Sequence, residues 1–131
     1  MKKILTLVCC TILLAATSCT KKYVTPASTT IFKTASNWQL RNNSPAGFFG
    51  YVSVVSVPEI DNYFDNNGTV SVAIDYNNTG VYEPISSVNG GNSLWYTYDV
   101  KGNVTIYSQN PDGSAPTASP GDLPLKIVLL P

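Results

Sequence analysis

The chain has 131 residues with equal numbers of acids and bases, so its formal net charge is zero. The bases are scattered rather than gathered into the basic stripe that neutralises phosphates, which excludes nucleic-acid binding. Histidine is absent, which removes the commonest general base and metal ligand and every Ser-His-Asp or Cys-His catalytic arrangement.

The first eighteen residues have the layout of a secretory signal peptide. Met1-Lys2-Lys3 is positively charged, residues 4–14 are uncharged and mostly apolar, and residues 15–18 are small. The apolar stretch is shorter than the about 20 residues that a helix needs to span a bilayer. We therefore predict that residues 1–18 direct export and are then removed.

The end of this signal predicts a lipid attachment site. Ala16-Thr17-Ser18-Cys19 resembles the lipobox of bacterial lipoproteins, which implies cleavage between Ser18 and Cys19 and a diacylglycerol on the Cys19 sulfur. Two or more acyl chains give stable membrane anchoring. The other cysteines lie inside the signal, so the mature chain would hold no free thiol and no intrachain disulfide. The alternative is an ordinary secretory signal that ends near a cysteine.

Residues 19–29 are predicted to be a tether, and residues 30–131 a single domain. The tether contains Lys21-Lys22, Pro26 and a Ser/Thr run, and it has little to bury. The domain is rich in Asn, Ser, Thr, Gly, Tyr and Val and poor in charge, a composition that favours strands and turns over helices.

The domain contains a succession of strand-like segments. Residues 68–76 alternate most clearly, with Val70, Val72, Ile74 and Tyr76 on a buried face and Thr69, Ser71, Ala73 and Asp75 on a wet face. Pro84 places the segment 81–88 at an edge or a bulge, and Lys101-Gly102 predicts a β-hairpin. Residues 125–130 are nearly all apolar, as in a strand buried on both faces. The remaining segments are 30–34, 38–41, 48–57, 94–100 and 103–108.

About seven such strands with frequent turns predict an all-β fold, a single antiparallel sandwich of the immunoglobulin-like or a related type. One short helix or turn is expected near residues 58–66, at an end of the β structure. Pro58 suits the first helical position, Glu59 and Asp61 suit the first turn, and Ile60 and Phe64 lie on one face.

The carboxylates suggest no catalytic or metal site. Glu59 and Asp61 could form a hydrolytic pair, but their position at a helix start explains them better. The clusters Asp61, Asp65, Asn66, Asn67 and Asp112, Asp122 match no calcium-loop spacing, and turn formation accounts for them. We therefore predict no enzyme activity, metal or cofactor.

The aromatic residues are the stronger binding candidates. In Leu94-Trp95-Tyr96-Thr97-Tyr98 the alternation places Trp95 opposite Tyr96 and Tyr98. One of the two sets must leave the core, where it could stack on sugar rings or contact a protein together with Tyr107. The alternative is that these side chains pack under a loop or at a sheet edge, and the sequence leaves both open.

The domain resembles small Bacteroidota lipoproteins, which combine a lipobox with a short β-rich domain. The similar motifs are Val57-Pro58-Glu59-Ile60, Asn67-Gly68-Thr69-Val70-Ser71-Val72, Tyr82-Glu83-Pro84-Ile85, Tyr96-Thr97-Tyr98 and Leu125-Lys126-Ile127-Val128-Leu129. The resemblance implies a short β-rich fold and a location in the cell envelope, where attachment to the outer membrane is expected. It implies no catalytic residues. The expected function is a non-catalytic binding or structural module contacting an envelope protein or another envelope component. The alternatives are a glycan-binding module and a small hydrolase.

Overall fold

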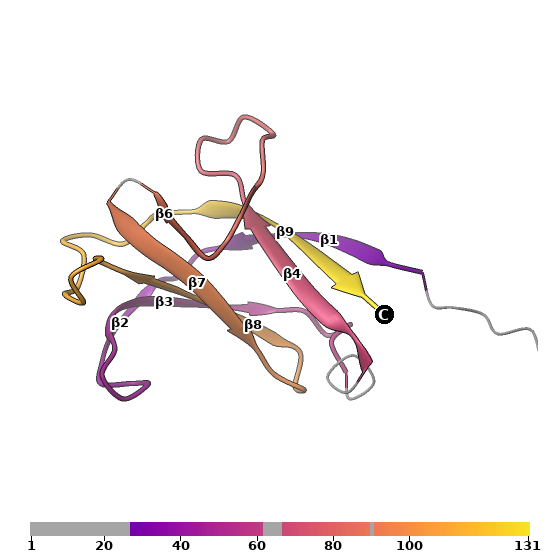
Figure 1. The fold of residues 1–131 in the computed structure, drawn as a ribbon, viewed down its shortest axis with the longest axis horizontal. Coiled ribbons are helices and arrows are strands. Elements are labelled where there is room, and N and C mark those ends of the chain that lie inside the picture. The colour runs from indigo at the N-terminus through magenta and orange to yellow at the C-terminus, as the bar shows by residue number, and fades with distance from the viewer. Residues whose placement is uncertain (1–26, 62–66, 90) are drawn as a thin grey trace, which may run out of the picture.

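The computed structural model describes residues 27–61, 67–89 and 91–131, which form two antiparallel sheets packed as two layers (Figure 1). One sheet has the order β1-β9-β4-β5 and the other β2-β3-β8-β7-β6. This confirms the predicted all-β sandwich. The predicted signal peptide, Cys19 and residues 20–26 of the tether lie outside the described residues. The strands are β1 Thr29–Ala35, β2 Gln39–Asn42, β3 Phe49–Ser56, β4 Thr69–Ile74, β5 Glu83–Pro84, β6 Ser87–Asn89, β7 Asn92–Tyr98, β8 Asn103–Gln109 and β9 Leu123–Leu130.

The first and last strands, β1 and β9, are antiparallel neighbours. In the immunoglobulin arrangement the first strand pairs instead with the second, so this sandwich is a related type.

The segment 81–88 divides between the two sheets. β5 is the edge of one sheet and β6 the edge of the other, and Pro84 suits an edge because it has no N–H to donate. Between them Ile85 is buried, and its N–H donates to the Val72 carbonyl at 3.2 Å. The predicted edge position is confirmed, with two short strands in place of one.

The core lies between the layers and is built by alternation. Val70, Val72 and Ile74 of β4 are at most 1% exposed, and they pair in register with Leu129, Ile127 and Leu125 of β9. The prediction that β9 is buried on both faces is wrong, because only alternate side chains of that strand are fully buried. β9 lies between β1 and β4 in its sheet, so its outward-facing side chains are partly covered by neighbouring strands. This partial cover accounts for the apolar residues on its outer face.

The turn after β3 is tied to the β7–β8 hairpin that the sequence predicted. The Val57 N–H donates to the Gly102 carbonyl at 2.7 Å, and the Ile60 N–H donates to the Val57 carbonyl at 3.0 Å. Pro58 and Glu59 form a turn, and Ile60 is buried in the core. Residues 58–61 therefore contain a turn and not a helix, and residues 62–66 of the expected segment lie outside the described residues.

Asp75 departs from the predicted wet face, because β4 ends at Ile74 and the next loop closes over the carboxylate. Its Oδ1 accepts N–H bonds from Asn77 at 3.3 Å and Thr79 at 3.0 Å, and Oδ2 accepts one from Gly80 at 2.6 Å. Burial acts to raise the pKa of this carboxyl, but the backbone N–H donors together hold the pKa below its ordinary value of 3.8.

We expect Asp75→Asn to lower the free energy of unfolding at pH 7 because an amide nitrogen cannot accept the Gly80 N–H. A carboxyl with a folded pKa below its unfolded value contributes stability that is present above about pH 4 and lost as pH falls through the folded pKa. The wild-type and Asp75→Asn free energies of unfolding, measured with urea, should therefore approach each other as the pH falls below about 4. The charge-matched control is Asp122→Asn, at an exposed position. A difference that stays constant with pH would contradict this role.

Candidate functional site

The outer face of the five-stranded sheet carries two of the four aromatic residues predicted as ligand contacts. Trp95 of β7 and Tyr107 of β8 are cross-strand partners, and both are half-buried. Tyr96 and Tyr98 point to the opposite side and pack against the core. The four predicted ligand-contact residues are therefore divided between the two faces of the sheet. Only Trp95 and Tyr107, on the outer face, are available to a ligand.

Tyr96 has a structural role. Its hydroxyl donates to the Val70 carbonyl of the facing sheet at 2.7 Å, which joins the two layers. Burial raises the pKa of the Tyr96 hydroxyl, so the group keeps its proton as a hydrogen-bond donor.

Phe48, Trp95 and Tyr107 form an aromatic cluster on the outer face. The Trp95 and Tyr107 rings stack with centroids 5.4 Å apart and an interplanar angle of 9°. Phe48 meets both rings edge-on, with centroids 5.7 Å from Trp95 and 5.4 Å from Tyr107. Stacked and edge-to-face pairs are both favourable. The cluster thus fixes the orientation of the Tyr107 ring.

Gly50 lets Phe48 lie close to the sheet. A Cβ on Gly50 would be 2.9 Å from Cζ of Phe48 and would also collide with the Ser108 carbonyl oxygen. Phe48 is only 5% exposed because it occupies the space that a side chain at position 50 would fill.

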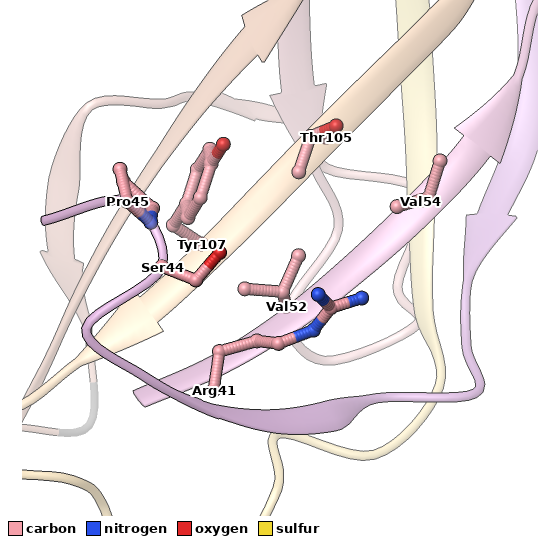
Figure 2. A pocket seen from close by; sticks show the side chains of 7 residues that line it. All are labelled: Arg41, Ser44, Pro45, Val52, Val54, Thr105 and Tyr107. Carbon is pink, nitrogen blue, oxygen red and sulfur yellow. The ribbon is translucent and has the colours of Figure 1, made fainter. Parts of the chain in front are cut away.

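A groove lies beside this cluster, over β2, β3 and β8 (Figure 2). We define the β2–β3 groove as two neighbouring hollows of about 320 Å³ and about 280 Å³. Both hollows share Arg41, Val52 and Val54. The first adds Ser44, Pro45, Thr105 and Tyr107, and the second adds Ser36, Asn37 and Gln39.

The chemistry of the groove combines apolar, neutral polar and cationic groups. Val54 is 57% exposed, so the floor presents apolar surface to solvent. Hydroxyl and amide side chains supply hydrogen-bonding groups, and Arg41 is the one cation among the lining residues, none of which is acidic. The Arg41 guanidinium donates from Nη2 to Oε1 of Gln39 at 3.0 Å. This arrangement can bind an anion.

Two further hollows lie elsewhere on the described surface. One of about 400 Å³ flanks Trp95, next to Val88, and one of about 520 Å³ lies between Asn92 and the loop after β8. No aspartate or glutamate lines either of them. Within the described ranges, no three His, Cys, Asp or Glu side chains converge as a metal site, and no helix there has the length and apolarity to cross a bilayer.

Searches of protein-family models, curated proteins and solved structures found no match to this chain. The assignment of the site therefore depends on the geometry of its own residues.

Phe48 and Arg41 were not predicted from the sequence, and Tyr107 is the one groove residue that was. A local signal existed for Phe48, because Phe48-Phe49-Gly50-Tyr51 places a glycine two residues from an aromatic residue. On one face of a strand these positions are neighbours, and strand glycine often marks a close approach. No local signal exists for Arg41, because its place beside Gly50 depends on the pairing of β2 with β3.

Proposed function

We propose that this protein is a non-catalytic binding module of the bacterial cell envelope, held to the membrane by lipid on Cys19. Its ligand binds on the outer face of the five-stranded sheet. The observation that carries this proposal is the Trp95–Tyr107 stack with the β2–β3 groove beside it. Large aromatic residues on an outer sheet face, beside a groove with hydrogen-bonding groups, are typical of recognition surfaces.

The lipid anchor is supported by the lipobox-like run before Cys19 and by the short distance to the domain. Nine residues separate Cys19 from the start of β1 at Thr29. Fully extended, such a segment reaches about 30 Å. The domain would therefore lie close to the membrane surface, where envelope components are its available ligands.

Intact mass and membrane fractionation of the native protein beside its Cys19→Ala variant test the anchor. We expect wild type in the membrane fraction, with the mass of residues 19–131 plus acyl chains. The Cys19→Ala variant should lose acylation and cleavage at position 19 because the sulfur that carries the lipid is gone. A soluble, unmodified wild type cleaved elsewhere would contradict the anchor and make a freely secreted binding protein the better proposal.

Glycan binding is the second candidate, and the orientation of Tyr107 favours it. Trp95 on β7 covers one face of the Tyr107 ring, which leaves the other face turned toward β3 and the groove. An aromatic face beside hydroxyl and amide groups suits the apolar face and hydroxyl rim of a sugar. The hydrolase alternative has no comparable support, because it needs two carboxylates across a cleft and none lines the β2–β3 groove.

A further inference from the structure

We propose that the β2–β3 groove binds an acidic sugar, a pyranose ring that carries a carboxylate, as in the uronic acid units of polysaccharides. Arg41 binds the carboxylate and Tyr107 stacks on the ring. This inference rests on the proposed binding function of the same face and adds the chemical class of the ligand.

The positive charge of the groove favours an anionic ligand. Arg41 is exposed, and no residue that lines the groove is acidic. Among the described residues no carboxylate forms an ion pair with the Arg41 guanidinium, whose hydrogen bond goes to the neutral amide of Gln39. A guanidinium binds a carboxylate through two parallel N–H donors. The positive charge of Arg41 is thus not neutralised by an acid in the described part of the chain, and the hydrogen bond to Gln39 holds the guanidinium in place.

The spacing of Tyr107 and Arg41 fits a sugar ring with a charged substituent. Gln39, Val52 and Tyr107 lie in one cross-strand row, and Arg41 and Gly50 form the next row on the same face. Two strand spacings, about 10 Å in total, separate β2 from β8. In Figure 2 the Arg41 side chain extends over β3, its guanidinium lies between Val52 and Val54, and Tyr107 lies on the other side of Val52. A ring that stacks on Tyr107 and covers Val52 therefore places a substituent beside the guanidinium.

The uncharged lining suits the hydroxyl groups of such a ligand. Ser44 and Thr105 line the hollow that contains Tyr107, and Ser36, Asn37 and Gln39 line the hollow beyond Arg41. Hydroxyl groups and the Asn and Gln amides both donate and accept hydrogen bonds, as sugar hydroxyls require. The two connected hollows continue along the sheet face, which accommodates a polymer of such units.

An acidic peptide is a weaker fit, because extended peptides bind sheets by adding a strand at an edge. The longest edge strand described is β1. Its Lys33 pairs with the buried Leu125 and shares the core-facing side with Ala35. An inward-pointing lysine on an edge strand is a recognised guard against strand addition. The groove instead lies on a sheet face, where side chains meet the ligand.

Affinity electrophoresis of the full-length protein in detergent tests the inference. The probes are polygalacturonate, alginate and hyaluronate, each beside its carboxyl-esterified form, with poly-L-glutamate as an acidic peptide. We expect retardation by at least one of the free acids and at least tenfold weaker binding to its ester. Arg41→Gln should weaken binding to the acid at least tenfold, and Arg41→Lys should weaken it less. Lys101→Gln, which removes the same charge on the β7–β8 hairpin, should leave binding within twofold.

Several results would overturn the acidic-sugar assignment. One is an equal loss of polysaccharide affinity in Arg41→Gln and Lys101→Gln, and another is equal affinity for the free acid and its ester. The others are binding of poly-L-glutamate that depends on Arg41, and no binding to any of the three polysaccharides. Binding of a neutral glycan or an envelope protein that Tyr107→Val abolishes would also overturn it, yet would leave the proposed binding face standing. Melting curves of each variant separate a loss of binding from a loss of fold.

Discussion

Replacing Gly102 by alanine is expected to lower the free energy of unfolding by about 3 kcal/mol. Gly102 has a φ of +81°, and its added Cβ would lie 2.8 Å from the Val57 carbonyl oxygen and 3.0 Å from Cα of Pro58. The left-handed backbone alone costs about 1–2 kcal/mol for a residue with a side chain, and overpacking costs a similar amount. The contacting atoms are backbone, so no side chain can rotate away. Thermal unfolding should show a melting temperature lowered by more than about 10 °C.

Comparison with Gly113→Ala separates the free-energy cost of the left-handed backbone from the cost of overpacking. Gly113 has a φ of +84°, but an added Cβ there would have no atom within 4 Å. This variant should therefore lose only about 1–2 kcal/mol. Equal losses in the two variants would show that the hairpin does not pack against the end of β3 as the Val57–Gly102 hydrogen bond indicates.

The strands and the hairpin were predictable because their signals are local. The alternation of Val70, Val72 and Ile74 has the period of a strand regardless of its neighbours, and Lys101-Gly102 carries its own turn chemistry. Asp75 is a residue whose environment the local alternation does not predict. The alternation places Asp75 on a wet face, but the strand ends one residue earlier and three backbone N–H groups of the next loop enclose the carboxylate.

The site was less predictable because it depends on which strands pair. Alternation establishes that Trp95 and Tyr96 point in opposite directions, but only the packing of the second sheet decides that Tyr96 enters the core. Register then decides the neighbours of each outward residue, and register is set by non-local pairing. Trp95 reaches Tyr107, and Arg41 reaches Gly50, only through the pairs β7–β8 and β2–β3.

Gly50→Ala is expected to lower the free energy of unfolding by about 3 kcal/mol and to disrupt the aromatic cluster. The added Cβ would collide with the Ser108 carbonyl oxygen, which belongs to β8, and would lie 2.9 Å from Cζ of Phe48. Either β3 separates from β8 at this point or Phe48 leaves Trp95 and Tyr107. Urea unfolding measures the loss of stability, and near-ultraviolet circular dichroism reports the altered packing of the rings.

Two variants keep this prediction testable if Gly50→Ala does not fold. Gly47→Ala changes a nearby loop glycine with a φ of +81° and open space around it, so it should lose only the backbone cost of about 1–2 kcal/mol and keep the aromatic spectrum. Phe48→Leu removes the edge-on ring but leaves Gly50 unchanged, so it should alter the spectrum while the sheet persists. Because Phe48 holds the Tyr107 ring in place, Phe48→Leu should also weaken ligand binding at the groove. A folded Gly50→Ala protein with wild-type stability and spectrum would contradict the packing of Phe48 over Gly50.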